Sequence, residues 1–142
     1  MTVIEEDRLV ALTTNDAFLI RRSFDLLWAK KQFATAFYDR LFELAPETRL
    51  LFHGDLRQQR SRLMTMVSAI VGMLDQPEMF RSTVANLTRR HATYGVQRRQ
   101  YEPFRAALFW SLAQSLGSAF TPETEKAWRT LYSMLHPTSA KV

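Results

Sequence analysis

Residues Leu87–Val96 read Leu-Thr-Arg-Arg-His-Ala-Thr-Tyr-Gly-Val, and this stretch is the most informative part of the chain about its fold and function. Phe80, Val84 and Leu87 precede His91 at spacings that place all four on one stripe of an amphipathic helix. Gly95 ends that helix, because glycine readily adopts the left-handed backbone conformation found after a last turn. An inward-facing histidine at such a place is either a core side chain bonded to a backbone carbonyl or a ligand to a metal or haem iron.

The length and composition are those of one globular domain. The chain has 142 residues, which is enough to bury a core. It contains no cysteine, which excludes disulfides, thiolate metal sites and thiol catalysis. No run is long and apolar enough to span a bilayer, and the acidic start, Met1–Asp7, lacks the apolar region of a signal peptide. We therefore expect a cytoplasmic protein with no membrane partner.

The basic residues raise the question of nucleic-acid binding. Nineteen Lys and Arg against 14 Asp and Glu give a net charge of +5. They are scattered in pairs such as Arg21-Arg22 and Arg98-Arg99, without an aromatic-interleaved stripe or a known reading motif. This pattern is typical of solvated helix faces, so we expect no specific nucleic-acid partner. The alternative, a basic helical nucleic-acid binder, predicts salt-dependent DNA binding and no chromophore.

The spacing of apolar residues predicts an all-α chain. Glycine and proline number only four and five, and they fall between helical patterns. We expect an N-terminal extension over residues 1–13 and one helical domain over residues 14–142. The expected helix starts and breaks are a cap at Thr14 or Asn15, a junction near Trp28–Lys31, a turn from Pro46, a cap at Asp55, and helices beginning near Pro77, Tyr101 and Pro122.

Two polar residues interrupt the apolar patterns. Gln59 lies on the apolar face of the helix predicted after Asp55, and Tyr38 lies among phenylalanines. Each could bond a backbone group, or Gln59 could lie at the edge of its stripe in water. Taken together with His91, the two residues indicate a shared polar target in an apolar pocket.

These residues stand in an order that resembles the globins, specifically bacterial single-domain globins related to flavohaemoglobins and neuroglobin-like proteins. The resemblance spans roughly residues 15–136. It is carried by residues 37–42 with 45–52, by Leu63-Met64, by residues 89–101 and by residues 117–132. It implies the globin fold, with six to eight helices packed around a pocket for haem b, iron protoporphyrin IX.

The resemblance also implies a role for each matching residue. His91 is expected to bind the iron through Nε2, while its Nδ1–H donates to a carbonyl near Leu87. Phe52 is expected to pack flat on the porphyrin, and Gln59 and Tyr38 to face the bound gas. The other expected haem contacts are Leu63, Leu87, Val96, Tyr101, Phe104 and Leu108, with Arg62 as a candidate partner of the propionates.

The distal residues predict firm binding of oxygen. The Tyr38 hydroxyl and the Gln59 amide are donors, and two hydrogen bonds of about 1–2 kcal/mol each would slow oxygen release by one to two orders of magnitude. Gln59 stands where a histidine could capture the iron, so we expect an open or water-bound sixth position. His53 follows Phe52 and is expected to point to solvent.

The expected function is reversible binding of dioxygen, NO and CO. Nitric oxide dioxygenation to nitrate, with an external reductase, is the candidate enzymatic activity. Tyr101 fits the proximal tyrosine of flavohaemoglobins, but no late glutamate stands at the matching distance, which argues against strong peroxidase activity. The alternatives are a non-catalytic gas sensor or a haem-free interaction module. The oligomeric state, the physiological ligand and the reductant stay open.

Overall fold

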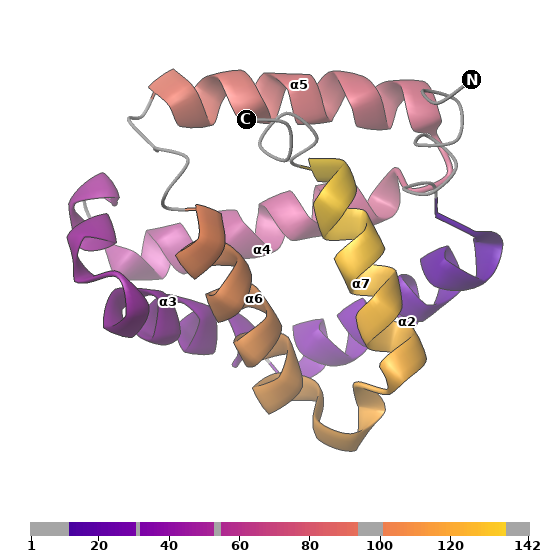
Figure 1. Cartoon of the computed structure of the whole chain (residues 1–142), viewed down its shortest axis with the longest axis horizontal. Helices are drawn as coiled ribbons and strands as arrows, with labels where there is room; N and C mark the ends of the chain where they lie inside the picture. Colours follow the sequence, from indigo (N-terminus) through magenta and orange to yellow (C-terminus); the bar gives the residue numbers. More distant parts are fainter. Residues whose placement is uncertain (1–11, 31, 53–54, 94–100, 136–142) are drawn as a thin grey trace.

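The computed structural model describes residues 12–30, 32–52, 55–93 and 101–135. All regular structure within these ranges is helical, which confirms the all-α prediction (Figure 1). No helix among them is both long and apolar enough to cross a membrane. The elements are α2 (Thr14–Lys30), α3 (Phe33–Leu44), η1 (Pro46–Leu51), α4 (Leu56–Gly72), α5 (Pro77–Thr93), α6 (Tyr101–Leu116), η3 (Gly117–Ala119) and α7 (Pro122–Leu135).

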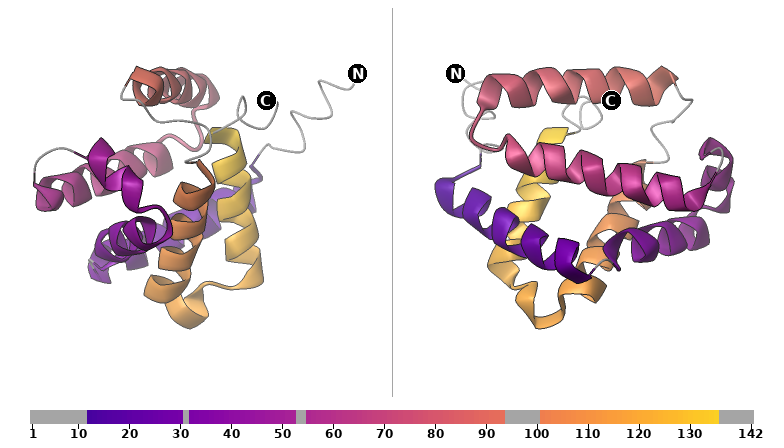
Figure 2. Two further views of the ribbon diagram at one scale, coloured as in Figure 1. Left: turned by 60° about the vertical axis from the view of Figure 1, so that its left-hand side comes forward. Right: turned by 180° about the vertical axis from the view of Figure 1, so that it is seen from behind.

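The helices pack in pairs that are distant in sequence. Helix α3 packs against α6, α2 packs against α7, and α4 contacts both α2 and α3. Helix α5 lies at one edge of the fold, opposite the turn that joins α6 to α7, and α4 lies between α5 and the α2–α3 pair (Figures 1 and 2). The two helices that carry Gln59 and His91, α4 and α5, are therefore neighbours at this edge.

The cap of α2 differs from the prediction. The Asp16 backbone N–H donates to Thr13 Oγ1 at 2.9 Å, and the Thr13 N–H donates to the Asp16 carboxylate at 3.1 Å. This reciprocal pair is a capping box, so Thr13 is the N-cap and the prediction of Thr14 or Asn15 was wrong. A capping box needs an acceptor side chain three residues after the cap. Thr14 and Asn15 are followed at that distance by Ala17 and Phe18, whose apolar side chains cannot accept a hydrogen bond.

The predicted helix end at Gly95 lies outside the described residues, and the other predicted helix starts within them are confirmed. Asp55 caps α4 by accepting from the Arg57 backbone N–H at 3.0 Å. Thr121 caps α7 by accepting from the Thr124 N–H at 3.2 Å, with Pro122 in the first turn. The predicted junction after Trp28 falls between Lys30 and Phe33. Gly117 follows α6 with φ of 55°, a conformation that glycine adopts without strain.

The main core is built by α2, α4, α6 and α7, with Phe80 and Val84 of α5. A buried hydrogen bond lies inside it, because the Trp128 indole N–H donates to Ser23 Oγ at 2.8 Å. Ser23 in turn donates to the Leu19 carbonyl at 2.8 Å, so the polar groups of this contact are paired. The bond from Trp128 to Ser23 therefore joins α7 to α2 inside the core.

Replacing Leu112 by alanine tests this core. Leu112 is 0% exposed, so the substitution leaves a cavity and is expected to lower the free energy of unfolding by about 2–5 kcal/mol. Leu50 is 78% exposed, and Leu50→Ala is the matched control, with an expected change within about 0.5 kcal/mol. Urea unfolding followed by circular dichroism measures both. Equal losses for the two variants would contradict the placement of the core.

Candidate functional site

A second apolar cluster lies where α3, η1, α4 and α6 meet. Its buried members are Phe37, Tyr38, Leu41 and Ala107, and the half-buried side chains packed against them are Phe42, Phe52, Leu63, Phe104 and Leu108. Five of the predicted site residues thus share one cluster, and they come from α3, α4, α6 and the residue that follows η1. The close packing of α3 on α6 is what brings Tyr38 together with Phe104 and Leu108.

Tyr38 is the polar centre of this cluster. Its ring stands edge-on to Phe37, with centroids 5.0 Å apart, and edge-on to Phe52 at 5.2 Å. The residue is only 6% exposed. Its hydroxyl donates to the Gln59 backbone carbonyl at 3.4 Å, which is long for a bond between oxygens and therefore weak. The structure thus brings the predicted pair together, and the bond joins the Tyr38 hydroxyl to the main chain of Gln59.

Burial sets the protonation state of Tyr38. The loss of water around the phenol raises the pKa of Tyr38 to about 12. The hydroxyl therefore keeps its proton at all physiological pH values. A phenol that stays protonated inside an apolar cluster is a permanent hydrogen-bond donor.

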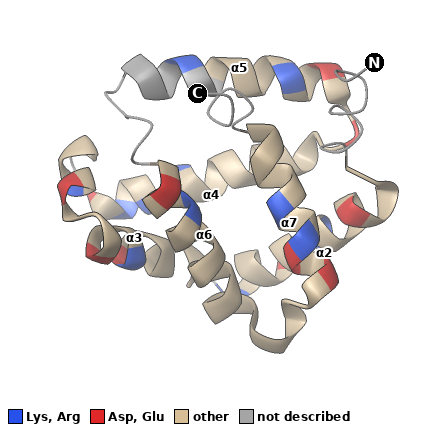
Figure 3. Ribbon diagram, viewed as in Figure 1, with Lys and Arg blue, Asp and Glu red and all other residues tan. Residues whose placement is uncertain are grey.

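Helix α4 contributes the side of the site that faces Tyr38. Gln59 and Leu63 are half-buried, and Leu63 contacts both the main core and the cluster around Tyr38. Arg62 is exposed. The helix contains three arginines and no acidic residue, so its charge is of one sign (Figure 3).

Helix α5 carries the apolar stripe from which the inward-facing position of His91 was predicted. Phe80 is 5% exposed and Val84 is 7% exposed, so the first half of the stripe faces the core as predicted. His91 lies in the last turn of α5. The side chains of His91 and Leu87 lie outside what the structure describes, as do residues Val96 and His53.

Tyr101, the first residue of α6, is joined to α7 by a bond that the sequence did not predict. The Tyr132 hydroxyl donates to the Tyr101 backbone carbonyl at 3.3 Å. Burial is the largest cause of a raised pKa for Tyr132, so this group also stays protonated. Tyr132 had no predicted role at the site. The available signal was that a tyrosine, unlike a leucine, needs a partner for its hydroxyl when buried.

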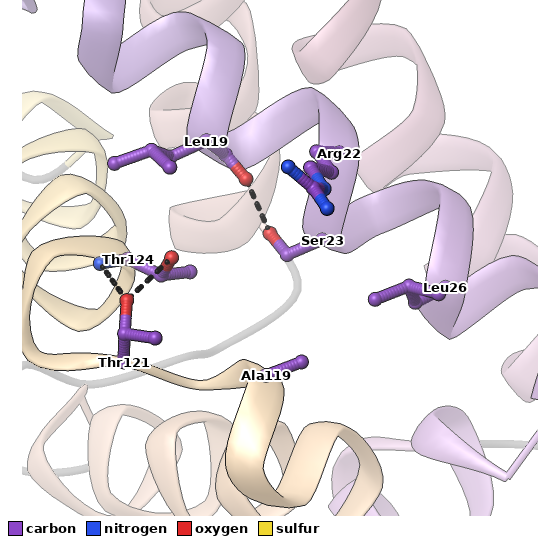
Figure 4. Close-up of a pocket in the computed structure, with 7 residues that line it drawn as sticks. All are labelled: Leu19, Arg22, Ser23, Leu26, Ala119, Thr121 and Thr124. Carbon is purple, nitrogen blue, oxygen red and sulfur yellow. Dashed lines mark hydrogen bonds between the residues drawn. The ribbon is translucent and has the colours of Figure 1, made fainter.

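A cavity of about 270 Å³ lies elsewhere, between α2 and the corner from η3 to α7 (Figure 4). Its walls are Leu19, Arg22, Ser23, Leu26, Ala119, Thr121 and Thr124. The hydroxyls of Ser23, Thr121 and Thr124 are paired within the protein. None of the predicted site residues lines it, so it is separate from the cluster around Tyr38.

Comparison with known proteins places the chain in a family. The family model described as Globin matches residues 35–138, a range that includes every predicted site residue. Neuroglobin of Tetraodon nigroviridis and Neuroglobin of Danio rerio are each 30% identical over 139 residues, covering 87% of this chain and 87% of each relative. A Flavohemoprotein of Rhizobium meliloti (strain 1021) is 30% identical over 102 residues, covering 70% of this chain and 25% of that protein. Globins bind haem and, through it, diatomic gases. The chain belongs to the globin family.

Proposed function

We propose that this globin binds haem b with His91 as the iron ligand, and holds dioxygen through Tyr38 and Gln59. The observation that carries the proposal is the buried Tyr38 hydroxyl. It stays protonated at neutral pH, it has only a long bond to a carbonyl, and it lies among four other side chains that the resemblance assigns to the pocket. When bound, haem supplies an iron that binds diatomic gases reversibly.

The residues present fit such a group. Haem is a broad apolar disc with two anionic propionates at its edge, so it needs apolar walls and a cationic rim. Phe52, Leu63, Phe104 and Leu108 are only half-buried although they belong to an apolar cluster, and an apolar disc would cover their remaining surface. The exposed Arg62 is our proposed partner of the propionates.

Tyr38 and Gln59 are proposed to stabilise dioxygen rather than carbon monoxide. Bound dioxygen carries more negative charge on its outer atom than bound carbon monoxide, so it gains more from a donor. The Tyr38 hydroxyl gives up only its 3.4 Å bond when it turns to the ligand. Leu63 and Phe52 exclude water around these donors, which strengthens each hydrogen bond.

We further propose that this oxygen binding serves nitric oxide dioxygenation. The overall change combines one NO, one dioxygen and one electron to give nitrate, so the protein must take an electron from an external reductase in each turnover. The similarity to a flavohemoprotein over 70% of this chain supports an activity coupled to an electron donor. Firm oxygen binding by Tyr38 suits it, because dioxygen must be held until NO arrives.

Mixing the reduced, oxygen-equilibrated protein with NO in a stopped-flow spectrometer tests this activity. We expect complete oxidation within milliseconds and one nitrate per oxidised protein, measured by ion chromatography. Gln59→Ala and Tyr38→Phe are expected to lower the yield, because dioxygen leaves before NO arrives. If the wild-type protein gives neither rapid oxidation nor nitrate, the dioxygenase proposal is wrong and a non-catalytic gas-binding or sensing function replaces it.

A further inference from the structure

The positive charge of this chain is concentrated on two neighbouring helices. Helix α4 holds Arg57, Arg60 and Arg62 with no acidic residue, and α5 holds three arginines with one glutamate. Six arginines against one glutamate give these helices a net charge of +5, which equals that of the whole chain. The rest of the molecule is neutral, and Figure 3 shows basic and acidic residues mixed on the other helices.

Among the described residues, the arginines of α4 lack the carboxylate partners that four other arginines have, as do Arg22, Arg49 and Arg81. Four arginines elsewhere lie within 4 Å of a carboxylate, in the pairs Arg21–Asp75, Arg40–Glu43, Arg105–Glu102 and Arg129–Glu125. No such pair is found for Arg57, Arg60 or Arg62 within the described part of the chain. The acid nearest in sequence, Asp55, caps α4 by accepting from a backbone N–H. The charge of this helix is therefore available to an outside partner.

The same two turns of α4 face the proposed pocket on their other side. Gln59 and Leu63 are half-buried, and Leu63 packs in both apolar clusters, whereas Arg57 is exposed. Arg60, which is half-buried, follows Arg57 by three residues and shares its side of the helix, whereas the exposed Arg62 lies on the opposite flank from Arg60. A helix with its side chains is about 10–12 Å across. A protein that docks on the outward side of α4 therefore lies within about one helix diameter of the pocket residues.

We propose that this surface, the α4 arginine face formed by Arg57 and Arg60, docks the acidic surface of an electron-donating protein. The inference rests on the proposed function, because it names the partner that supplies the electron. Complexes for electron transfer have small interfaces, and charge complementarity steers their association and sets their orientation. Uncompensated arginines beside the pocket supply the positive half of such a complex.

The surroundings of the α4 arginine face favour an acidic protein over other anionic partners. None of the exposed large apolar side chains lies on α4, whereas a helix that binds a membrane surface buries an apolar face in it. The residues between Arg57 and Arg60 are Gln58 and Gln59, so no aromatic side chain is present there on which bases could stack.

A charge-reversal pair tests the proposal with an acidic [2Fe–2S] ferredoxin as the probe. Arg57→Glu with Arg60→Glu reverses two charges on the α4 arginine face and leaves Arg62, the proposed propionate partner, in place. Arg22→Glu with Lys126→Glu makes the same net change at exposed positions of α2 and α7 and is the matched control. Surface plasmon resonance at low ionic strength measures ferredoxin binding, and stopped-flow measures reduction of the ferric protein.

We expect the α4 variant to bind ferredoxin about tenfold more weakly and to be reduced by it about tenfold more slowly, with both differences shrinking as salt is added. The control should stay close to wild type, and reduction by dithionite should be the same in all three proteins. Equal losses in the two variants would overturn the assignment to α4, since only net charge would then matter. A loss specific to the α4 variant that occurs with duplex DNA or phosphatidylserine vesicles, and not with ferredoxin, would also overturn it.

The binding measurement separates this inference from the proposed function. Surface plasmon resonance needs no haem and no turnover, so it reports on docking even if NO dioxygenation fails. Conversely, nitrate formation by a protein reduced with dithionite does not depend on docking. Nitrate formation with no α4-dependent ferredoxin binding would leave the proposed function standing and remove the inference.

Discussion

The His91→Gly protein is expected to lose its haem, because no other side chain replaces the iron–imidazole bond. Loss of a residue that merely orients a metal ligand already lowers affinity about 10–100-fold, so loss of the ligand itself should lower haem affinity by more than about 100-fold. Spectrophotometric titration of the apoprotein with haemin measures this affinity. Added imidazole should restore the Soret spectrum of the variant, because it supplies the missing nitrogen in the space left by the side chain.

His53→Gly is the matched control for that experiment. His53 is the histidine next to Phe52 in sequence and was expected to point to solvent, so its loss should leave haem affinity unchanged. The opposite pattern, with haem kept by His91→Gly and lost by His53→Gly, would assign the iron to His53. Rescue by imidazole separates loss of a ligand from loss of folding, because an unfolded chain would not regain the spectrum.

Replacing Tyr38 by phenylalanine is expected to raise the dissociation rate of oxygen about tenfold. The phenol contributes one hydrogen bond to a polar ligand, and a bond of about 1–2 kcal/mol corresponds to roughly that factor. Phenylalanine keeps the edge-on ring contacts with Phe37 and Phe52, so the pocket walls should survive. Carbon monoxide dissociation should change much less, because that ligand is a poor acceptor.

Flash photolysis or rapid displacement of oxygen by carbon monoxide measures these rates. Tyr132→Phe is the control, since it removes another buried hydroxyl that bonds to a backbone carbonyl at the start of α6. It is expected to leave the oxygen rate close to wild type. An unchanged oxygen dissociation rate in Tyr38→Phe would refute the role proposed for this tyrosine.

Much of the fold could be predicted from local sequence. Asp55 caps α4 as expected, and Thr121 caps the helix expected to begin near Pro122, because their side-chain oxygens reach the first free N–H groups. The cap of α2 could have been predicted too, since Thr13 and Asp16 have the spacing of a capping box. The cap was placed one or two residues too late because Thr14 and Asn15 are equally good caps taken singly.

The sequence predicted several residues of the cluster around Tyr38, but not the hydrogen bonds that they make. Phe52, Leu63, Phe104 and Leu108 were named from the order of motifs along the chain, and all of them contact the cluster. The bond from Tyr38 to the Gln59 carbonyl depends on how α3 crosses α4, which periodicity does not determine. The same holds for the bond from Tyr132 to Tyr101, which depends on the approach of α7 to the start of α6.

Helix α6 shows a further limit of periodicity. An amphipathic pattern predicts one buried stripe, but this helix packs against α2 as well as α3, so residues on more than one side are buried. Ser111 is 0% exposed and pairs its hydroxyl with the Leu108 carbonyl at 2.9 Å. A small hydroxyl residue is tolerated there because this local bond needs no partner from another helix.

Titration of the purified apoprotein with haemin, followed in the visible spectrum, tests whether this chain binds haem and, through it, diatomic gases. We expect saturation at one haem per chain with a sharp Soret band, and reversible spectral shifts when the reduced protein is exposed to oxygen and then to carbon monoxide. A titration without saturation, or a bound haem that binds neither gas after reduction, would contradict this expectation.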